Sequence, residues 1–200
     1  SLDQILNQGS KLIILVIAAH PDDEVLGCGG MMAKLSTNNA VHTLIMGEGL
    51  TSRRPNRSDT DSKLIDKLTQ DAKNSAKVLG TESISFLNLP DNRFDEVSLL
   101  SIVKSVEKHI DLIKPDTIYT HQPGDLNIDH QITFRAVLTA TRPLKSTSVK
   151  NLYSFEIPSS TEWSFNQLGH VFNPNMFYDI TDTLETKLEA LECYSDEMRE

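Results

Sequence analysis

A continuous apolar run that ends in a charged turn constrains the fold of this chain more than any other feature. Residues 12–19 read LIILVIAA, and His-Pro-Asp-Asp-Glu follows at residues 20–24. An uninterrupted run of branched apolar residues is typical of a strand buried on both faces, as in a parallel sheet covered by helices. The run is far shorter than the ~20 residues that a membrane-spanning helix needs. It therefore predicts a buried strand whose carboxyl end carries polar side chains.

Strand-like and helix-like segments alternate along the rest of the chain. Short apolar runs predict further strands at residues 41–46, 84–89, 117–120 and 152–157. Apolar residues spaced three or four apart predict amphipathic helices at residues 24–36, 64–79, 99–113, 129–140 and 184–194, with Asp129 near an N-cap. This alternation predicts an α/β fold with a mainly parallel sheet flanked by helices. The 200 residues fit a single domain, in which residues 1–9 are interpreted as an N-terminal tail.

The composition argues against several classes of partner. Asp and Glu outnumber Lys and Arg by 28 to 19, which gives a net charge of −9. A nucleic-acid binder needs clustered cations to contact phosphates, and a polybasic membrane binder needs them to contact lipid headgroups. The two cysteines, Cys28 and Cys193, are too few for a disulfide framework. The composition therefore favours a reduced, cytoplasmic protein that binds neither nucleic acid nor a membrane.

Two clusters of histidine and aspartate are expected to meet in space. His20, Asp22 and Asp23 follow the first predicted strand, and His130 follows the strand at residues 117–120. Parallel strands present their carboxyl ends at one edge of the sheet, where ligands collect. Three of these side chains could bind zinc and leave one carboxylate to take a proton from water. In the competing interpretation, the two aspartates only cap a helix and complement its dipole.

Two segments carry a resemblance to a known family. The sequence AHPDDEVLGCGG at residues 19–30 resembles the signature of the PIG-L/LmbE-like zinc-dependent N-deacetylases. DLNIDH at residues 125–130 is similar to the second motif of that family, which ends in Asp-His. The resemblance implies a Rossmann-like fold without a dinucleotide. It also implies removal of an N-acyl group, usually acetyl, from an amino sugar or a small molecule that carries one.

The same resemblance assigns roles to individual residues. It implies that His20, Asp23 and His130 bind zinc, although such ligands also accept iron or manganese. Asp22 is then the general base that activates the zinc-bound water. Asp129 is expected to lie next to the ligands and tune them. Members of the family often assemble into homo-oligomers, and the resemblance allows a homo-oligomer here.

One position departs from the pattern of the family. Many members have a histidine where this chain has Asn127, which can donate a hydrogen bond to substrate but cannot supply a proton at neutral pH. One hypothesis is that His121, at the end of the same strand, protonates the departing amine in its place. The other is that Asp22, once protonated, returns its proton to the amine.

Other residues are weaker candidates for substrate contacts. Arg53, with Arg54 beside it, lies in a polar loop where an arginine of the family contacts substrate, and a solvated loop is the equal alternative. Glu48 is a candidate for holding that loop or the substrate. Trp163, the single tryptophan, is a candidate for stacking on a sugar face, with packing in the core or an interface as the competing use.

The glycines at residues 27, 29 and 30 do not form a phosphate-binding loop. They lack the GxGxxG spacing, and no Gly-Lys-Ser or Gly-Lys-Thr follows them. We expect them to let a helix pack closely, with Cys28 as a small buried residue and not a nucleophile. The charged turn also stands where a dinucleotide-binding protein has its glycine-rich fingerprint. The alternatives that remain are hydrolysis of a non-sugar amide at the same metal site and a non-catalytic sugar- or nucleotide-binding protein.

Overall fold

A parallel sheet forms the centre of the protein. The computed structural model describes residues 11–53, 56–143, 147–158, 160–165 and 171–195. In this part of the chain five strands pair in the order β3-β2-β1-β4-β5, all parallel. The strands are β1 (Ile13–Ala18), β2 (Ala40–Gly47), β3 (Ser83–Leu89), β4 (Thr117–His121) and β5 (Asn151–Phe155). The predicted α/β fold with a parallel sheet is therefore confirmed.

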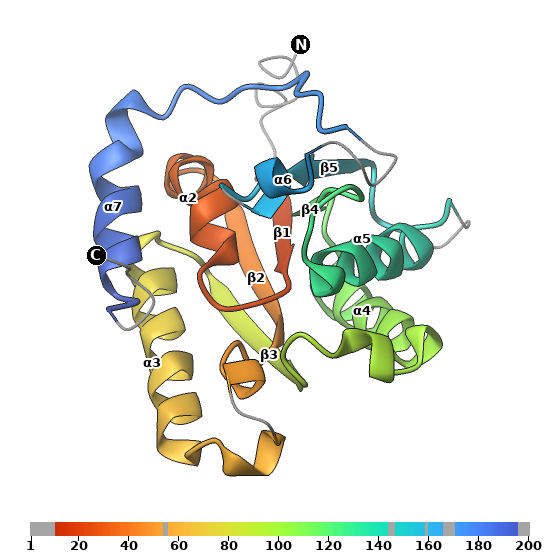
Figure 1. Cartoon of the computed structure of the whole chain (residues 1–200). Helices are drawn as coiled ribbons and strands as arrows, with labels where there is room; N and C mark the ends of the chain where they lie inside the picture. The colour runs from red at the N-terminus through yellow and green to blue at the C-terminus, as the bar shows by residue number, and fades with distance from the viewer. Residues whose placement is uncertain (1–10, 54–55, 144–146, 159, 166–170, 196–200) are drawn as a thin grey trace.

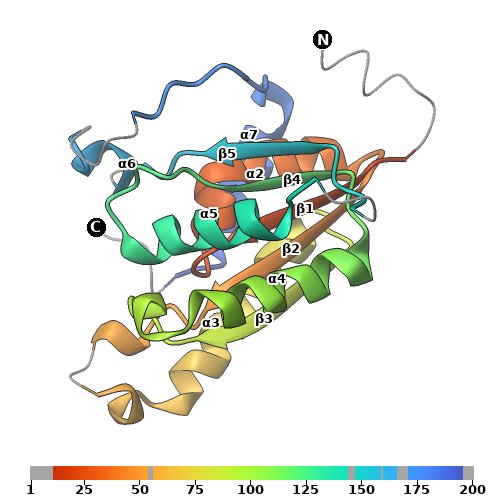
Figure 2. The ribbon, with the colours of Figure 1, turned by 90° about the vertical axis from the view of Figure 1, so that its right-hand side faces the viewer.

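Helices cover both faces of the sheet. The α-helices are α2 (Asp23–Ser36), α3 (Ser62–Val78), α4 (Leu99–Ile113), α5 (Ile128–Ala140), α6 (Ser160–Trp163) and α7 (Leu184–Glu192). The 3-10 turns are η1 (Thr51–Arg53), η2 (Arg57–Asp59), η3 (Phe94–Glu96) and η4 (Thr181–Thr183). Figures 1 and 2 show α2, α3 and α7 on one face and α4 and α5 on the other. None of the described helices is both long enough and apolar enough to cross a membrane.

The apolar run at residues 12–19 is uninterrupted because helices cover both faces of the sheet. Successive side chains of a strand point to opposite faces. Accordingly, Ile14 and Val16 pack in the core cluster with α2, α3 and α7, whereas Leu15 and Ile17 pack in the cluster with α4 and α5. Both faces of β1 are covered, so every position of the run has to be apolar.

Two boundaries near the predicted site differ from the sequence prediction. The helix expected from residue 129 begins at Ile128, and its N-cap is Asn127 instead of Asp129. The Oδ1 atom of Asn127 accepts a hydrogen bond from the Asp129 N–H at 2.8 Å, which is the usual bond of an asparagine cap. The last strand ends at Phe155 and does not reach residue 157.

The glycines of α2 allow close packing, as predicted. A Cβ atom on Gly30 would lie 2.7 Å from the side chain of Ile180, and one on Gly27 would overlap the ring of Phe155. α2 therefore lies tightly between β5 and the segment that precedes α7. Close packing fixes the height of this helix over the sheet, and with it the position of the residues at its N-terminus.

The strand order places one crevice at the centre of the sheet. The chain runs outward from β1 to β3 in one direction and from β4 to β5 in the other, so the order reverses between β1 and β4. Ligands of open α/β sheets bind at such a switch point, beyond the carboxyl ends of the strands. The turn after β1 and the segment after β4 flank this crevice, and both carry the predicted histidines and aspartates.

Candidate metal centre

The three predicted metal ligands lie together at this crevice. Asp23 is the first residue of α2, and its Oδ2 atom lies 3.4 Å from His20 Nδ1 and 3.1 Å from His130 Nε2. The side chains of His20, Asp23 and His130 are 12%, 6% and 3% exposed. One donor atom from each residue lies within 4.8 Å of the other two. The two motifs, far apart in sequence, therefore converge on one small volume.

A carboxylate lies against the outer nitrogen of each histidine. His20 Nε2 lies 2.9 Å from Asp129 Oδ2, and His130 Nδ1 lies 3.1 Å from Asp125 Oδ1. Asp129 is itself anchored, because it accepts hydrogen bonds from the N–H groups of Asn92 and Phe94 at 2.6 and 3.0 Å. A carboxylate on one ring nitrogen places the proton there and leaves the lone pair of the other nitrogen for a metal. This donor set fits a divalent cation such as zinc.

The charges at the crevice favour a cation. Burial disfavours the charged form of His20, but its hydrogen bonds to Asp129 and Asp23 outweigh burial and raise the pKa of His20 to about 10. Burial likewise opposes the charge on His130, yet the neighbouring Asp23 and Asp125 raise its pKa to about 9. Both histidines thus behave as groups in a strongly negative environment, which a divalent cation would neutralise.

Asp91 also reaches this cluster, and the sequence reading missed it. It lies just after β3, and its Oδ1 atom is 3.3 Å from His20 Nε2. Its Oδ2 atom accepts hydrogen bonds from Ser52 N–H and Oγ–H at 3.0 and 2.5 Å. The rule that identified the other sites applies here too, because Asp91 is a polar residue at the carboxyl end of a parallel strand. Asp91 therefore connects the loop of η1 with a predicted metal ligand.

Asp22 occupies the N-cap position of α2 without capping it. Its backbone has φ 98° and ψ −31°, and its side chain accepts no hydrogen bond from the N–H groups of the helix. Its carbonyl oxygen instead accepts hydrogen bonds from Val25 and Leu26, both at 2.9 Å. The simple capping interpretation of Asp22 is therefore wrong. Asp22 is partly buried and directly precedes Asp23, one of the predicted ligands.

His121 lies beside two of the predicted ligands, with its Nε2 atom 3.5 Å from Asp23 Oδ2. Its side chain is fully buried, and its Nε2 atom accepts the Ala19 N–H at 2.8 Å. Its ring stacks on His130 with 3.9 Å between the ring centroids. Burial and the neighbouring His130 hold its pKa well below the usual value for histidine. A buried neutral imidazole whose Nε2 accepts a backbone hydrogen bond is poorly suited to donating a proton to substrate.

The residues considered for substrate contacts have separate positions. Asn127 caps α5 and donates from Nδ2 to Asn92 Oδ1 at 3.0 Å, so its amide is already engaged at the crevice. Trp163 is 55% exposed, and it ends α6. This helix is anchored near the metal centre, because Ser160 and Thr161 donate hydrogen bonds to the Asp125 carboxylate. The exposure of Trp163 argues against packing in the core.

The loop after β2 carries an ion pair between Glu48 and Arg57. Arg53 ends η1 and is exposed, and Arg54 lies outside the described residues. Glu48 pairs with Arg57, whose Nε and Nη2 atoms donate to its two carboxylate oxygens. Arg57 also donates to the Asn88 carbonyl oxygen at 3.2 Å, at the end of β3. Glu48 therefore helps to hold the loop, as one of the two uses proposed for it requires.

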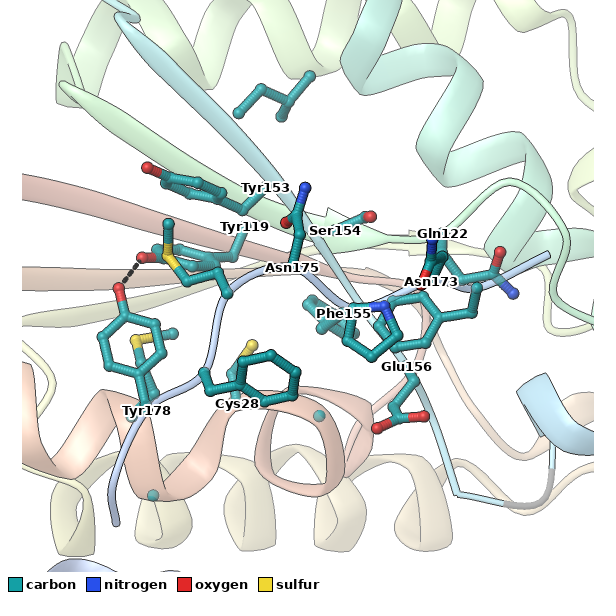
Figure 3. A pocket seen from close by; sticks show the side chains of 18 of the residues that line it. Cys28, Tyr119, Gln122, Tyr153, Ser154, Phe155, Glu156, Asn173, Asn175 and Tyr178 are labelled. Atoms are coloured by element: carbon teal, nitrogen blue, oxygen red, sulfur yellow. Dashed lines mark hydrogen bonds between the residues drawn. The ribbon is translucent and has the colours of Figure 1, made fainter. Parts of the chain in front are cut away.

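A second cavity of about 690 Å³ lies against α2 and the face of β4 and β5. Figure 3 shows aromatic residues from these strands and from the segment before α7 around it, with a hydroxyl–hydroxyl hydrogen bond between Tyr119 and Tyr178. Cys28 also lines the cavity, and burial raises the pKa of its thiol, as expected for a cysteine that is not a nucleophile. Phe155 lies between this cavity and His121, with 4.8 Å between their ring centroids.

Comparison with known proteins identifies the family. The family model PIG-L, described as GlcNAc-PI de-N-acetylase, matches residues 15–141, which contain all three predicted ligands. The chain belongs to the PIG-L family. It is 29% identical to the uncharacterised deacetylase YaiS of Escherichia coli K12 over 187 residues, covering 89% of this chain and 88% of YaiS. It is 24% identical to the diacetylchitobiose deacetylase of Thermococcus kodakarensis over 196 residues, covering 94% of this chain and 70% of that enzyme.

Solved structures of other proteins share the fold of this PIG-L family member. The N,N'-diacetylchitobiose deacetylase of Pyrococcus horikoshii superimposes with a TM-score of 0.71 at 23% identity, over 94% of this chain and 71% of that one. The zinc-inhibited form of teicoplanin deacetylase Orf2 gives 0.72 at 18% identity, over 92% and 84% of the two chains. The hydratase GalB of Pseudomonas putida gives 0.73 at 21% identity, over 92% and 79%. At these identities the likeness establishes the fold and not the reaction.

Proposed function

We propose that this PIG-L family member is a zinc-dependent N-deacetylase that hydrolyses the acetamide of an N-acetylated amino sugar or of a conjugate carrying one. The observation that carries the proposal is the convergence of His20, Asp23 and His130 from the starts of two helices. Both histidines have a carboxylate on the outer nitrogen, which is typical of metal-binding histidines. The relatives named diacetylchitobiose deacetylase support the class of substrate.

His20, Asp23 and His130 would hold the metal, and Asp129 and Asp125 would keep the two imidazoles in the required tautomer. A divalent cation held there supplies Lewis-acid chemistry, because it lowers the pKa of water and polarises an amide carbonyl. A set of three protein ligands is typical of catalytic zinc sites, which keep a further position open for water or substrate.

Asp22 is proposed to transfer a proton from water to the departing nitrogen. As the water oxygen forms a bond to the carbonyl carbon of the acetamide, the Asp22 carboxylate takes a proton from that water. The same proton then passes from Asp22 to the nitrogen as the C–N bond breaks, which yields a free amine and acetic acid, and the acid loses its proton to solvent to give acetate. We assign the return of the proton to Asp22 and not to His121, because the His121 ring is buried and its Nε2 atom accepts the Ala19 N–H.

Metal analysis is the first test of this proposal. The wild-type protein, purified without chelator, is expected to contain about one zinc ion per chain, since a site with three ligands binds one ion. Asp23→Ala and His130→Ala are expected to lose it, whereas Asp66→Ala, which removes an exposed carboxylate on α3, should retain it. A wild-type protein that takes up no divalent metal would contradict the proposal.

The reaction is tested by acetate release from a panel of substrates. N-acetylglucosamine and diacetylchitobiose represent the sugar class, and simple N-alkyl acetamides represent non-sugar amides. Release from the sugars alone supports the proposal, and release from the alkyl acetamides alone supports the non-sugar alternative. Because GalB is a hydratase with the same fold, the panel also includes an unsaturated acid, whose hydration without any acetate release would overturn the deacetylase assignment.

A further inference from the structure

The carboxylate of Glu24 is buried next to the proposed catalytic base. Glu24 follows Asp23 in α2 and is 2% exposed. Its Oε2 atom accepts the backbone N–H of Asp22 at 3.1 Å, and its Oε1 atom accepts a hydrogen bond from the Tyr194 hydroxyl. A buried carboxylate is costly unless its oxygens receive hydrogen bonds, and here each oxygen receives one.

The hydrogen bond from Asp22 to Glu24 falls on a strained part of the backbone. At φ 98° Asp22 has a conformation that L-residues rarely adopt. Such a conformation persists only where surrounding contacts hold it. The Asp22 carbonyl oxygen is fixed by the first turn of α2, through the N–H groups of Val25 and Leu26. The Glu24 carboxylate fixes the other side of the residue, at its N–H.

Tyr194 supports Glu24 from the other end of the chain. It lies just after α7, 170 residues from Glu24, and is almost completely buried in the core cluster of that face. α7 packs against α2 and α3, as Figure 1 shows, so the Tyr194 hydroxyl approaches Glu24 from a neighbouring element. The orientation of Asp22 therefore depends on a contact between α2 and the residue that follows α7.

We infer that Glu24 and Tyr194 are positioning residues, which hold the backbone of Asp22 in the conformation that presents its carboxylate to the metal centre. The inference rests on the proposed function, in which Asp22 carries the proton. Glu24 follows Asp23 in the chain, but its carboxylate receives its hydrogen bonds from Asp22 and Tyr194 and not from the three predicted ligands, and neither side chain contacts substrate in this scheme. Their loss should therefore affect the chemical step more than substrate binding or metal content.

The first test compares two tyrosine variants in the zinc-loaded protein. Tyr194→Phe removes the hydroxyl that holds Glu24, and Tyr119→Phe removes a partly buried hydroxyl that pairs with Tyr178. Tyr194→Phe is expected to lower kcat by about 10- to 100-fold, the usual cost of a small misplacement of a reacting group. KM should stay within about twofold and zinc content should be unchanged, since the interaction acts in the transition state. Tyr119→Phe should leave kcat unchanged.

Glu24 variants separate positioning from packing. Glu24→Leu fills a similar volume but accepts no hydrogen bond, and it should lower kcat as Tyr194→Phe does. Glu24→Gln keeps an oxygen for the Asp22 N–H and a polar group for Tyr194, so it should recover most of the activity that Glu24→Leu loses. The inference is overturned if Tyr194→Phe matches Tyr119→Phe in kcat, or if zinc is lost in parallel with activity.

A second readout does not depend on activity. The exchange of the Asp22 amide hydrogen with solvent, measured by NMR on zinc-loaded protein, should be faster in Tyr194→Phe and Glu24→Leu than in wild type or Tyr119→Phe. If wild type releases acetate from no substrate while exchange changes as expected, the proposed function fails and the support of Asp22 by Glu24 and Tyr194 stands. If wild type is active and exchange is unchanged, the inference fails alone.

Discussion

The starts of α2 and α5 serve the same centre but are built differently. Each follows a central strand at its carboxyl end, and each brings a predicted ligand to the crevice, Asp23 from α2 and His130 from α5. At α5 the cap residue Asn127 has an extended backbone, with φ −72° and ψ 126°, and its side chain accepts a helix N–H. At α2 the cap residue Asp22 has φ 98°, and its side chain makes no capping bond.

The difference shows how one helix start can be arranged for stability and the other for chemistry. The Asn127 side chain satisfies a backbone N–H that the helix would otherwise leave without an acceptor. The Asp22 side chain makes no such capping bond, and its carboxylate is the proposed proton acceptor. The strained backbone that results is held by Glu24, a residue inside the helix.

The largest expected difference between the two helix starts is catalytic. Asp22→Asn removes the proton acceptor but keeps the size of the side chain and tolerates φ above zero. We expect kcat for acetate release to fall by about 10²- to 10⁴-fold, the usual contribution of a general base, with zinc content unchanged. Asn127→Asp, which keeps the capping oxygen, is the matched variant at α5 and should retain most of the activity. Steady-state kinetics check this, and an Asp22→Asn enzyme with normal kcat would contradict the proton role.

A smaller effect is expected on metal affinity. Asp129→Asn removes the negative charge beside His20 Nε2 while keeping the size of the side chain. Loss of such an outer carboxylate typically weakens metal binding by about 10- to 100-fold. Competition for zinc with a chromogenic chelator measures the affinity, with Asp66→Asn on the exposed face of α3 as the control. Equal zinc affinity in wild type and Asp129→Asn would show that the carboxylate does not support this ligand.

The smallest expected effect is on the free energy of unfolding. Here we expect the cap residue of α5 to matter more than that of α2, the opposite of the expectation for catalysis. Asn127→Ala should lower the free energy of unfolding by about 1 kcal/mol, because the Asp129 N–H loses its acceptor. Asp22→Gly should lower it less, since no capping bond is lost and glycine adopts φ above zero without strain. Denaturant unfolding of both variants beside wild type tests this. A larger loss in Asp22→Gly than in Asn127→Ala would mean that the Asp22 side chain also stabilises the fold.

Local pattern was sufficient to predict the sheet and to place the candidate ligands at one of its edges. The apolar run at residues 12–19 specifies a strand covered on both faces, and the polar residues that follow it must then lie at the edge of the sheet. The resemblance to the family selected Asp23 from the Asp-Asp pair, which the residues alone left undecided. The convergence of His20 with His130 followed from strand order, which short-range pattern only suggests.

The remaining contacts depend on details that pattern does not carry. Asp91 reaches His20 because β3 ends at the same edge as β1, and the rule for strand ends covers Asp91 without separating it from an ordinary turn residue. The positive φ of Asp22 could not be predicted, because positive φ is usually inferred from a glycine and this residue is an aspartate. The burial of the His121 ring and its hydrogen bond from the Ala19 N–H are set by tertiary packing, which the sequence pattern around His121 does not show.

The hydrogen bond from the Tyr194 hydroxyl to Glu24 can form only late in the synthesis of the chain. Ribosomes synthesise the chain from its N-terminus. The turn with His20, Asp22 and Asp23 therefore leaves the ribosome long before Tyr194 does. Until Tyr194 has been added, one oxygen of Glu24 lacks the donor that it has in the folded protein. The turn gains its last hydrogen bond only when the residue after α7 packs against α2. A growing chain could therefore bind metal before its proposed base is fully positioned.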